Sequence, residues 1–200
     1  EWIDRGYEPD TSAVTDEQLT RLAASPLYRG GRHTGVRSRR ELAELLRLYD
    51  AEIRYTDHLV GQMCAYLKKR GWYDDCAVIL SADHGEQYGE GQMILEHGTV
   101  HDSCIHIPML LKLPGGAHRG EVCAHPVYGL DIAPAAARFF GVAAPEMWHG
   151  TALQDTLDGT AAPLEYLVCE HGLYTCQRAV LQDGWKMVHT FSPGLWDFAE

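Results

Sequence analysis

The stretch Cys76-Ala77-Val78-Ile79-Leu80-Ser81-Ala82-Asp83-His84-Gly85-Glu86 decides the fold class of this chain. It begins as a short apolar run with β-branched residues, which is typical of a central strand in a parallel sheet. It ends in the polar tetrapeptide 83–86. Because ligands of open α/β sheets bind beyond the carboxyl ends of the strands, we expect the chemistry of the protein at this tetrapeptide.

A long helix precedes the strand. Ser38 and Glu41 have the spacing of a capping box, and Gly71 follows the last basic turn as a stop signal. Between them the apolar positions recur every three, four or seven residues, which predicts one helix of about thirty residues. The recurring positions are Leu42, Leu45, Tyr49, Ile53, Val60, Met63 and Leu67, and we expect Asp50, Glu52, Asp57 and His58 on the solvent side. A long helix that leads into a buried strand is half of a βαβ unit, so the sequence predicts an α/β fold.

The rest of the chain gives weaker signals. Residues 1–37 read as loop with a short helix near 16–24, and the glycine-rich stretch 83–106 reads as one long loop. A second apolar strand is expected at 107–113. A helix is expected from Asp131, as its N-cap, to 140. After a linker near 159–163, short strands separated by Gly and Asp predict an antiparallel meander. The expected strands are 166–170, 178–182, 185–190 and 195–198.

Composition excludes several classes of protein. The 200 residues carry 17 Lys and Arg against 28 Asp and Glu, a net charge of -11, so no basic stripe exists to bind nucleic acid. No apolar run reaches the length of a membrane span. The six cysteines form no CxxC pair, which argues against a zinc ribbon or a thioredoxin-like site. We expect reduced thiols, with a Cys169–Cys176 disulfide as the alternative.

The strand end at 83–86 offers candidate metal ligands. Asp83 and His84 are adjacent, and a carboxylate beside an imidazole can bind Mn²⁺, Ca²⁺, Mg²⁺ or Zn²⁺. The alternative is a turn with a hydrogen bond to the Asp83 carboxylate. Further histidines follow at His97, His101 and His106, without the spacing of a helical zinc-protease motif. A histidine in a glycine-rich loop can bind an anion or protonate a leaving group, and the alternative is a set of exposed histidines.

Five segments, in order over about residues 45–200, resemble motifs of the sulfatase family. Residues 49–57 resemble its YxAEIxxxD helix, 80–86 its SDHGE or SDNGE strand end, and 97–108 its KGTLYEEGIRVP segment. Residues 129–150 and 178–198 are similar to its SLIDLAPTLLDLAGV…GRSL and RAVRTGDWKLI…ELYDL segments. The resemblance implies an α/β/α sandwich of the alkaline-phosphatase type with a small C-terminal antiparallel subdomain.

The resemblance also implies site residues. Asp83 and His84 match a pair that holds one divalent metal ion, with Ca²⁺ or Mn²⁺ expected first and Mg²⁺ or Zn²⁺ as alternatives. His97 stands where the family has a Lys or a His that contacts the sulfate and assists the leaving oxygen, so it is the expected catalytic and substrate-binding residue. His101 is a second expected substrate-binding residue. The family nucleophile is a formylglycine made in a CxPxR motif, beside two metal-binding Asp.

Neither the CxPxR motif nor the early Asp pair occurs in the chain. We therefore expect both upstream of Glu1, with 1–160 as the distal part of the catalytic domain and 161–200 as a truncated C-terminal subdomain. The chain alone is then expected to be inactive and to expose apolar surface. The implied substrate is a small-molecule sulfate ester. Because His84 also occurs in relatives that cleave phosphonate monoesters and phosphodiesters, such a hydrolase is the alternative, as is a non-catalytic binding module. The sequence indicates no compartment and leaves a homo-oligomer open.

Overall fold

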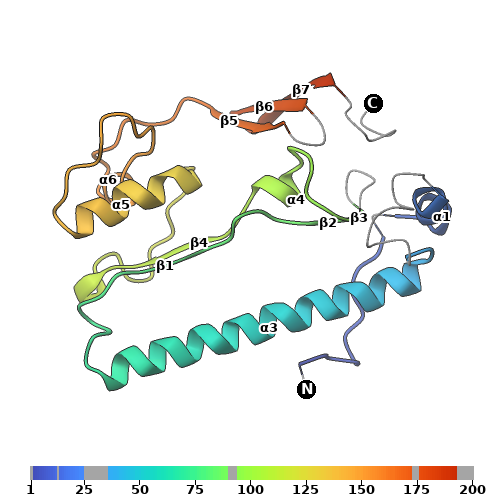
Figure 1. The fold of residues 1–200 in the computed structure, drawn as a ribbon, viewed down its shortest axis with the longest axis horizontal. Coiled ribbons are helices and arrows are strands. Elements are labelled where there is room, and N and C mark those ends of the chain that lie inside the picture. The colour runs from blue at the N-terminus through green and yellow to red at the C-terminus, as the bar shows by residue number, and fades with distance from the viewer. Residues whose placement is uncertain (1, 13, 25–35, 90–93, 173–175, 193–200) are drawn as a thin grey trace.

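The computed structural model describes residues 2–12, 14–24, 36–89, 94–172 and 176–192. Helix α3 (Arg39–Lys69) runs along one side of the strands β1 (Val78–Ser81) and β4 (Met109–Lys112). Helices α5 (Ile132–Phe139) and α6 (Leu153–Leu157) lie on the other side of these strands (Figure 1). The short helix α1 (Asp16–Ala24) lies near the start of α3. This order of helix, strands and helix is the expected α/β/α layering.

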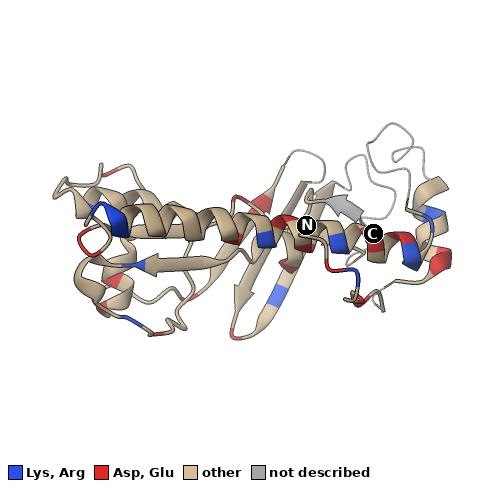
Figure 2. Ribbon diagram, turned by 90° about the horizontal axis from the view of Figure 1, so that it is seen from below, with Lys and Arg blue, Asp and Glu red and all other residues tan. Residues whose placement is uncertain are grey.

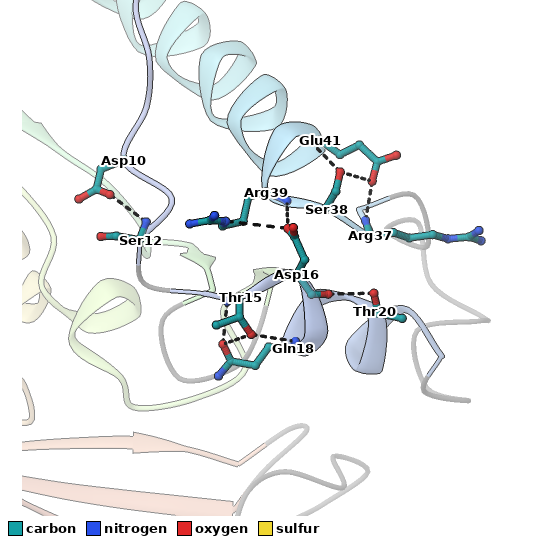
Figure 3. Close-up of polar contacts among 10 residues, drawn as sticks. All are labelled: Asp10, Ser12, Thr15, Asp16, Gln18, Thr20, Arg37, Ser38, Arg39 and Glu41. Carbon is teal, nitrogen blue, oxygen red and sulfur yellow. Dashed lines mark hydrogen bonds and ion pairs between the residues drawn. The ribbon is translucent and has the colours of Figure 1, made fainter.

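The start of α3 is fixed by the capping residues that the sequence indicates (Figure 3). The Ser38 Oγ accepts a hydrogen bond from the backbone N–H of Glu41 at 3.3 Å. The Glu41 carboxylate accepts in return from the backbone N–H of Arg37 at 2.7 Å, one residue before the usual capping-box partner. The Asp16 carboxylate of α1 accepts from the Arg39 backbone N–H at 2.7 Å. The predicted long helix is confirmed, and its first turn is tied to α1.

The apolar stripe of α3 is only partly buried. Leu42 is buried with Val14, Leu19 and Tyr88 in a small core cluster. Further along, Ile53 is 53% exposed. Tyr49 and Met63 are also exposed. Residues 58–67 contain no Lys, Arg, Asp or Glu before the basic helix end (Figure 2). Of the residues expected on the solvent side, Glu52, Asp57 and His58 are exposed and Asp50 is half-buried. The helix therefore presents an apolar surface, as expected from the sequence.

The predicted strands at 76–82 and 107–113 are present, but their direction is not as expected. β1 pairs with β4 in the antiparallel sense, with Val78 opposite Lys112 and Ser81 opposite Met109. The hydroxyl of Ser81 also donates to the Pro108 carbonyl at 2.9 Å. The expectation of a parallel neighbour is wrong for this pair. After the segment 83–106 the chain turns back as β4 and runs along β1, without the crossover helix that a parallel pair needs.

The segment 83–106 is not one long loop. It contains the short strands β2 (Gln87–Tyr88) and β3 (Ile94–Glu96), which pair antiparallel, and the helical turn α4 (Asp102–Ile105). The glycine content suggested a loop, whereas the pairing of β2 with β3 depends on contacts that the composition does not reveal.

Asp131 precedes α5, but its side chain does not cap that helix. A short 3₁₀ turn over Gly129–Asp131 leads into α5. The buried Asp131 carboxylate accepts from the backbone N–H groups of Tyr128 at 2.7 Å and Thr151 at 2.8 Å. The expected N-cap is therefore corrected: the carboxylate caps the preceding turn and ties it to the segment before α6.

The C-terminal strands form a separate three-stranded antiparallel sheet with the order β5-β6-β7. Its strands are β5 (Leu167–His171), β6 (Cys176–Gln182) and β7 (Trp185–Ser192), so three of the four predicted strands are confirmed. The fourth, at 195–198, lies outside the described residues. The sheet lies beside α4 in Figure 1. The division of the chain at 160/161 stays a prediction.

Two further observations concern the whole described chain. All six cysteines are free thiols, Cys169 and Cys176 included. Among the described helices, none has the length and apolar character needed to cross a membrane.

Candidate active site

The turn after β1 brings its backbone unusually close to α4. The backbone N–H of Gly85 donates to the Cys104 carbonyl at 2.8 Å. A Cβ atom on residue 85 would lie 1.9 Å from the Ser103 carbonyl oxygen. Gly85 is not among the glycines with positive φ. Glycine is therefore needed here for the close approach of two backbone segments.

Asp83 and His84 lie side by side beyond the end of β1. The Asp83 Oδ1 accepts from the His84 backbone N–H at 3.0 Å, and its Oδ2 lies 3.6 Å from the His84 Nε2. That backbone hydrogen bond is the main reason why the pKa of Asp83 is lowered, with a smaller contribution from the charge of His84. The carboxylate is exposed and ionised, so it can act as a ligand while it also caps its own turn.

His84, Glu86 and His97 form one compact group, in which the possible ligand atoms all lie within 4.8 Å of one another. The His97 Nδ1 is 3.3 Å from the Glu86 Oε2, and the rings of His84 and His97 stack with centroids 3.8 Å apart. The Glu86 Oε1 is buried without a hydrogen-bond partner. Two imidazoles, an orphaned carboxylate oxygen and the neighbouring Asp83 are a donor set that fits a divalent cation.

Glu86 is a residue to which the sequence assigned no role, although it belongs to the tetrapeptide singled out at the strand end. Its side chain is mostly buried and joins the segments at 83–86 and 97–100. The signal that could have found it is the spacing of two from His84. In extended chain leaving a strand, this spacing places two side chains on the same side.

His171, at the end of β5, is a second residue that local sequence reasoning missed. Desolvation lowers the pKa of its imidazole, and the charge of His97 contributes to the same shift. The two histidines are therefore electrostatic neighbours, although they are far apart in the sequence. Local sequence contains no signal for this proximity.

The His101 side chain contacts Ser103, two residues further along the chain. Its Nδ1 accepts from the Ser103 backbone N–H at 3.3 Å and lies 2.8 Å from the Ser103 Oγ, so the imidazole caps α4. It is exposed and is not part of the group formed by His84, Glu86 and His97. The substrate-binding role of His101 stays a prediction.

The sulfatase family model matches residues 2–142. A multifunctional alkaline phosphatase superfamily protein of Trinickia caryophylli is 24% identical over 74% of this chain and 30% of its own length. The choline-sulfatase of Rhizobium meliloti is 26% identical, over 72% of this chain and 28% of its own. The chain thus spans less than a third of these relatives.

Solved structures share the fold. The phosphonate monoester hydrolase of Agrobacterium radiobacter matches with a TM-score of 0.74 and 20% identity, over 94% of this chain and 44% of that protein. The corresponding enzyme of Silicibacter pomeroyi matches with a TM-score of 0.70 and 21% identity, over 88% of this chain and 38% of that one. These likenesses confirm the alkaline-phosphatase type of α/β/α fold. With a family model that covers most of its length, the chain belongs to the sulfatase family.

Proposed function

We propose that this chain supplies metal ligands and the leaving-group acid to the active site of a hydrolase that cleaves sulfate esters. The observation that supports the proposal most is the compact group of His84, Glu86 and His97 beside Asp83 at the end of β1. Relatives named as sulfatases match most of this chain at low identity.

Asp83 and His84 are the proposed ligands of one divalent metal ion, Ca²⁺ or Mn²⁺ before Mg²⁺ or Zn²⁺. When bound, such an ion neutralises the charge that develops on the transferred group and activates the nucleophile. The charges of the site support the need for a cation. Asp83 and Glu86 would repel a sulfate ester, and a divalent ion between them reverses the local charge. The formylglycine nucleophile belongs to the same proposal and would come from sequence outside these 200 residues.

His97 is the proposed general acid. Its Nδ1 faces the Glu86 carboxylate at 3.3 Å, which leaves its Nε2 as the ring nitrogen free to face a substrate. A carboxylate on one ring nitrogen fixes the orientation of the imidazole. Protonated His97 would bind an anionic oxygen of the substrate and then give its proton to the departing alkoxide.

A phosphonate monoester or phosphodiester hydrolase is the second candidate. The resemblance at His84 favours it, since it implies an Asp-His pair where many sulfatases have Asp-Asn, and two phosphonate monoester hydrolases share the fold. The two candidates share the roles proposed for Asp83, His84 and His97. They differ in the ester that the full-length protein turns over fastest, so parallel assays of alkyl sulfate, phosphodiester and phosphonate monoester separate them.

The leaving-group dependence of His97→Ala in the full-length protein tests the general acid. An acid matters most when the departing oxygen is basic, so we expect turnover of an alkyl sulfate to fall about 100-fold or more. Turnover of 4-nitrophenyl sulfate, whose leaving group needs little protonation, should fall far less. His106→Ala is the matched control, because His106 is an exposed histidine of the same segment outside the site. Equal losses on both esters would refute the role of His97. An intact full-length protein that hydrolyses none of the three ester classes would favour the binding module.

A further inference from the structure

One face of the C-terminal sheet is turned toward the segment that carries His97. Gln177 and Ala179 share this face of β6, because side chains alternate along a strand. The register places His171 of β5 opposite Gln177, and Lys186 of β7 opposite Leu181, two residues beyond Ala179. Ala179 is completely buried, which shows that this face is covered.

The two groups that bind Val100 come from this face. The Lys186 ammonium donates to the Val100 carbonyl and, at 2.7 Å, to the Asp102 Oδ1. The Val100 backbone N–H donates to the Gln177 Oε1 at 3.2 Å. Both backbone polar groups of a buried residue, three positions after His97, are thus bound by side chains of the sheet. We call Lys186 and Gln177 the sheet clamp.

The two residues of the sheet clamp have further contacts of their own. The Gln177 Nε2 donates to the Thr190 Oγ1 at 3.3 Å, so its amide is fixed between β6 and β7. The Lys186 side chain is only 20% exposed. The hydrogen bond from Lys186 is the main cause of the lowered pKa of the Asp102 carboxyl. A partly buried charged pair of this kind is stronger than an exposed surface ion pair.

The opposite side of the same segment is anchored to β2. The Thr99 hydroxyl donates to the Oε1 of the buried Gln87 at 3.1 Å and accepts from the His101 backbone N–H at 3.2 Å. The residues directly after His97 are therefore held between β2 and the C-terminal sheet. Removal of either anchor leaves the other, so the segment can shift without unfolding of the sheet.

We propose that Lys186 and Gln177 are positioning residues for His97: by fixing Val100, the C-terminal sheet determines where the His97 imidazole lies relative to Glu86 and His84. The inference rests on the proposed function of His97 as the general acid. Loss of the clamp would let His97 move away from Glu86. A displacement of about 1 Å in a catalytic group can cost about 100-fold in rate.

The experiment compares Lys186→Met with Arg178→Met in the full-length protein. Methionine keeps much of the length of lysine but removes the ammonium. Arg178 forms an ion pair at 2.6 Å with Glu170 on the opposite face of the same sheet, so its loss is a matched control. We expect Lys186→Met to lower kcat on an alkyl ester about 10- to 100-fold with little change in KM, and Arg178→Met to change it less than about twofold. Lys186→Arg should restore most of the loss.

Two further variants separate the backbone contact from the ion pair. Asp102→Asn removes the charged partner of Lys186 but leaves the Val100 carbonyl, so we expect a smaller loss of kcat than in Lys186→Met. Gln177→Leu removes the acceptor for the Val100 N–H and should act in the same direction as Lys186→Met. If Lys186→Met fails to fold, this pair still tests the proposal, because Gln177→Leu must then lower kcat and Asp102→Asn must lower it less.

A spectroscopic measurement makes the test independent of turnover. At fixed pH, the imidazole ¹H and ¹⁵N chemical shifts of His97 should change in Lys186→Met and stay unchanged in Arg178→Met. The proposal is overturned if both variants leave these shifts alone, or if both lower kcat equally. A wild-type protein without activity on any ester would refute the proposed function, whereas the chemical shifts would still decide whether the clamp positions His97.

Discussion

Replacement of Gly85 by Ala tests the close approach on which the site depends. The ideal Cβ of residue 85 lies 1.9 Å from the Ser103 carbonyl oxygen and 2.9 Å from the carbonyl carbon. Both atoms belong to backbone, so no side-chain rotation can relieve the contact. The turn after β1 must instead move away from α4 by about 1.5 Å to restore an ordinary contact distance.

The expected cost follows from two terms. Overpacking of this kind costs about 1–3 kcal/mol. The same movement lengthens the 2.8 Å hydrogen bond from Gly85 to Cys104 and loses about 1 kcal/mol more. The sum is about 2–4 kcal/mol, or about 30- to 1000-fold in the unfolding equilibrium. Because Asp83, His84 and Glu86 move with the turn, we also expect kcat to fall by about 100-fold.

Urea denaturation and steady-state kinetics of the full-length protein measure both effects. Gly61→Ala is the matched control. Its Cβ would meet nothing within 4 Å, and alanine in a helix interior is favoured over glycine by about 1 kcal/mol. Gly61→Ala should therefore keep the activity and stabilise the protein slightly. Unfolding free energies within 0.5 kcal/mol of each other for the two variants, or full activity in Gly85→Ala, would refute the reasoning about this contact.

Three further predictions concern stability. Hydrogen bonds to the carboxylates of Glu121 and then Asp158 raise the pKa of His118. The stabilisation by these contacts is therefore complete below about pH 6.5 and is lost as the pH rises through the raised pKa of the folded state. In chemical denaturation, the unfolding free energy of His118→Gln should lack this pH dependence. Asp131→Asn keeps one of two backbone hydrogen bonds to a buried carboxylate and should cost about 2–3 kcal/mol in chemical denaturation. Ser38→Ala removes the N-cap of α3 and should cost about 1 kcal/mol, without change in kcat.

The sequence predicted well those features that depend on neighbouring residues. The N-cap at Ser38 and the stop at Gly71 bound α3 as expected. The β-branched run before Asp83 predicted β1, and the short runs separated by Gly and Asp predicted β5, β6 and β7. Each of these signals reflects a local requirement, such as a hydrogen-bond partner for the free backbone groups at a helix end.

Part of the candidate site was predictable for the same reason. Asp83 and His84 are adjacent in the chain, so their proximity requires no knowledge of the fold. His97 was found through its resemblance to a family motif, and the structure then places it against Glu86 and His84. Spacing alone could not reveal this group, because the ten residues between Glu86 and His97 can follow many paths.

The sequence by itself determined the helix, the strands and the strand end that carries Asp83 and His84. Only the tertiary structure decided that β1 and β4 run antiparallel, that Gly85 touches α4, and that Lys186 holds Val100. The physical reason is the range of the interactions. Caps, turns and periodicity act within a few residues, whereas these three contacts join segments that are distant in sequence and form only when the chain packs.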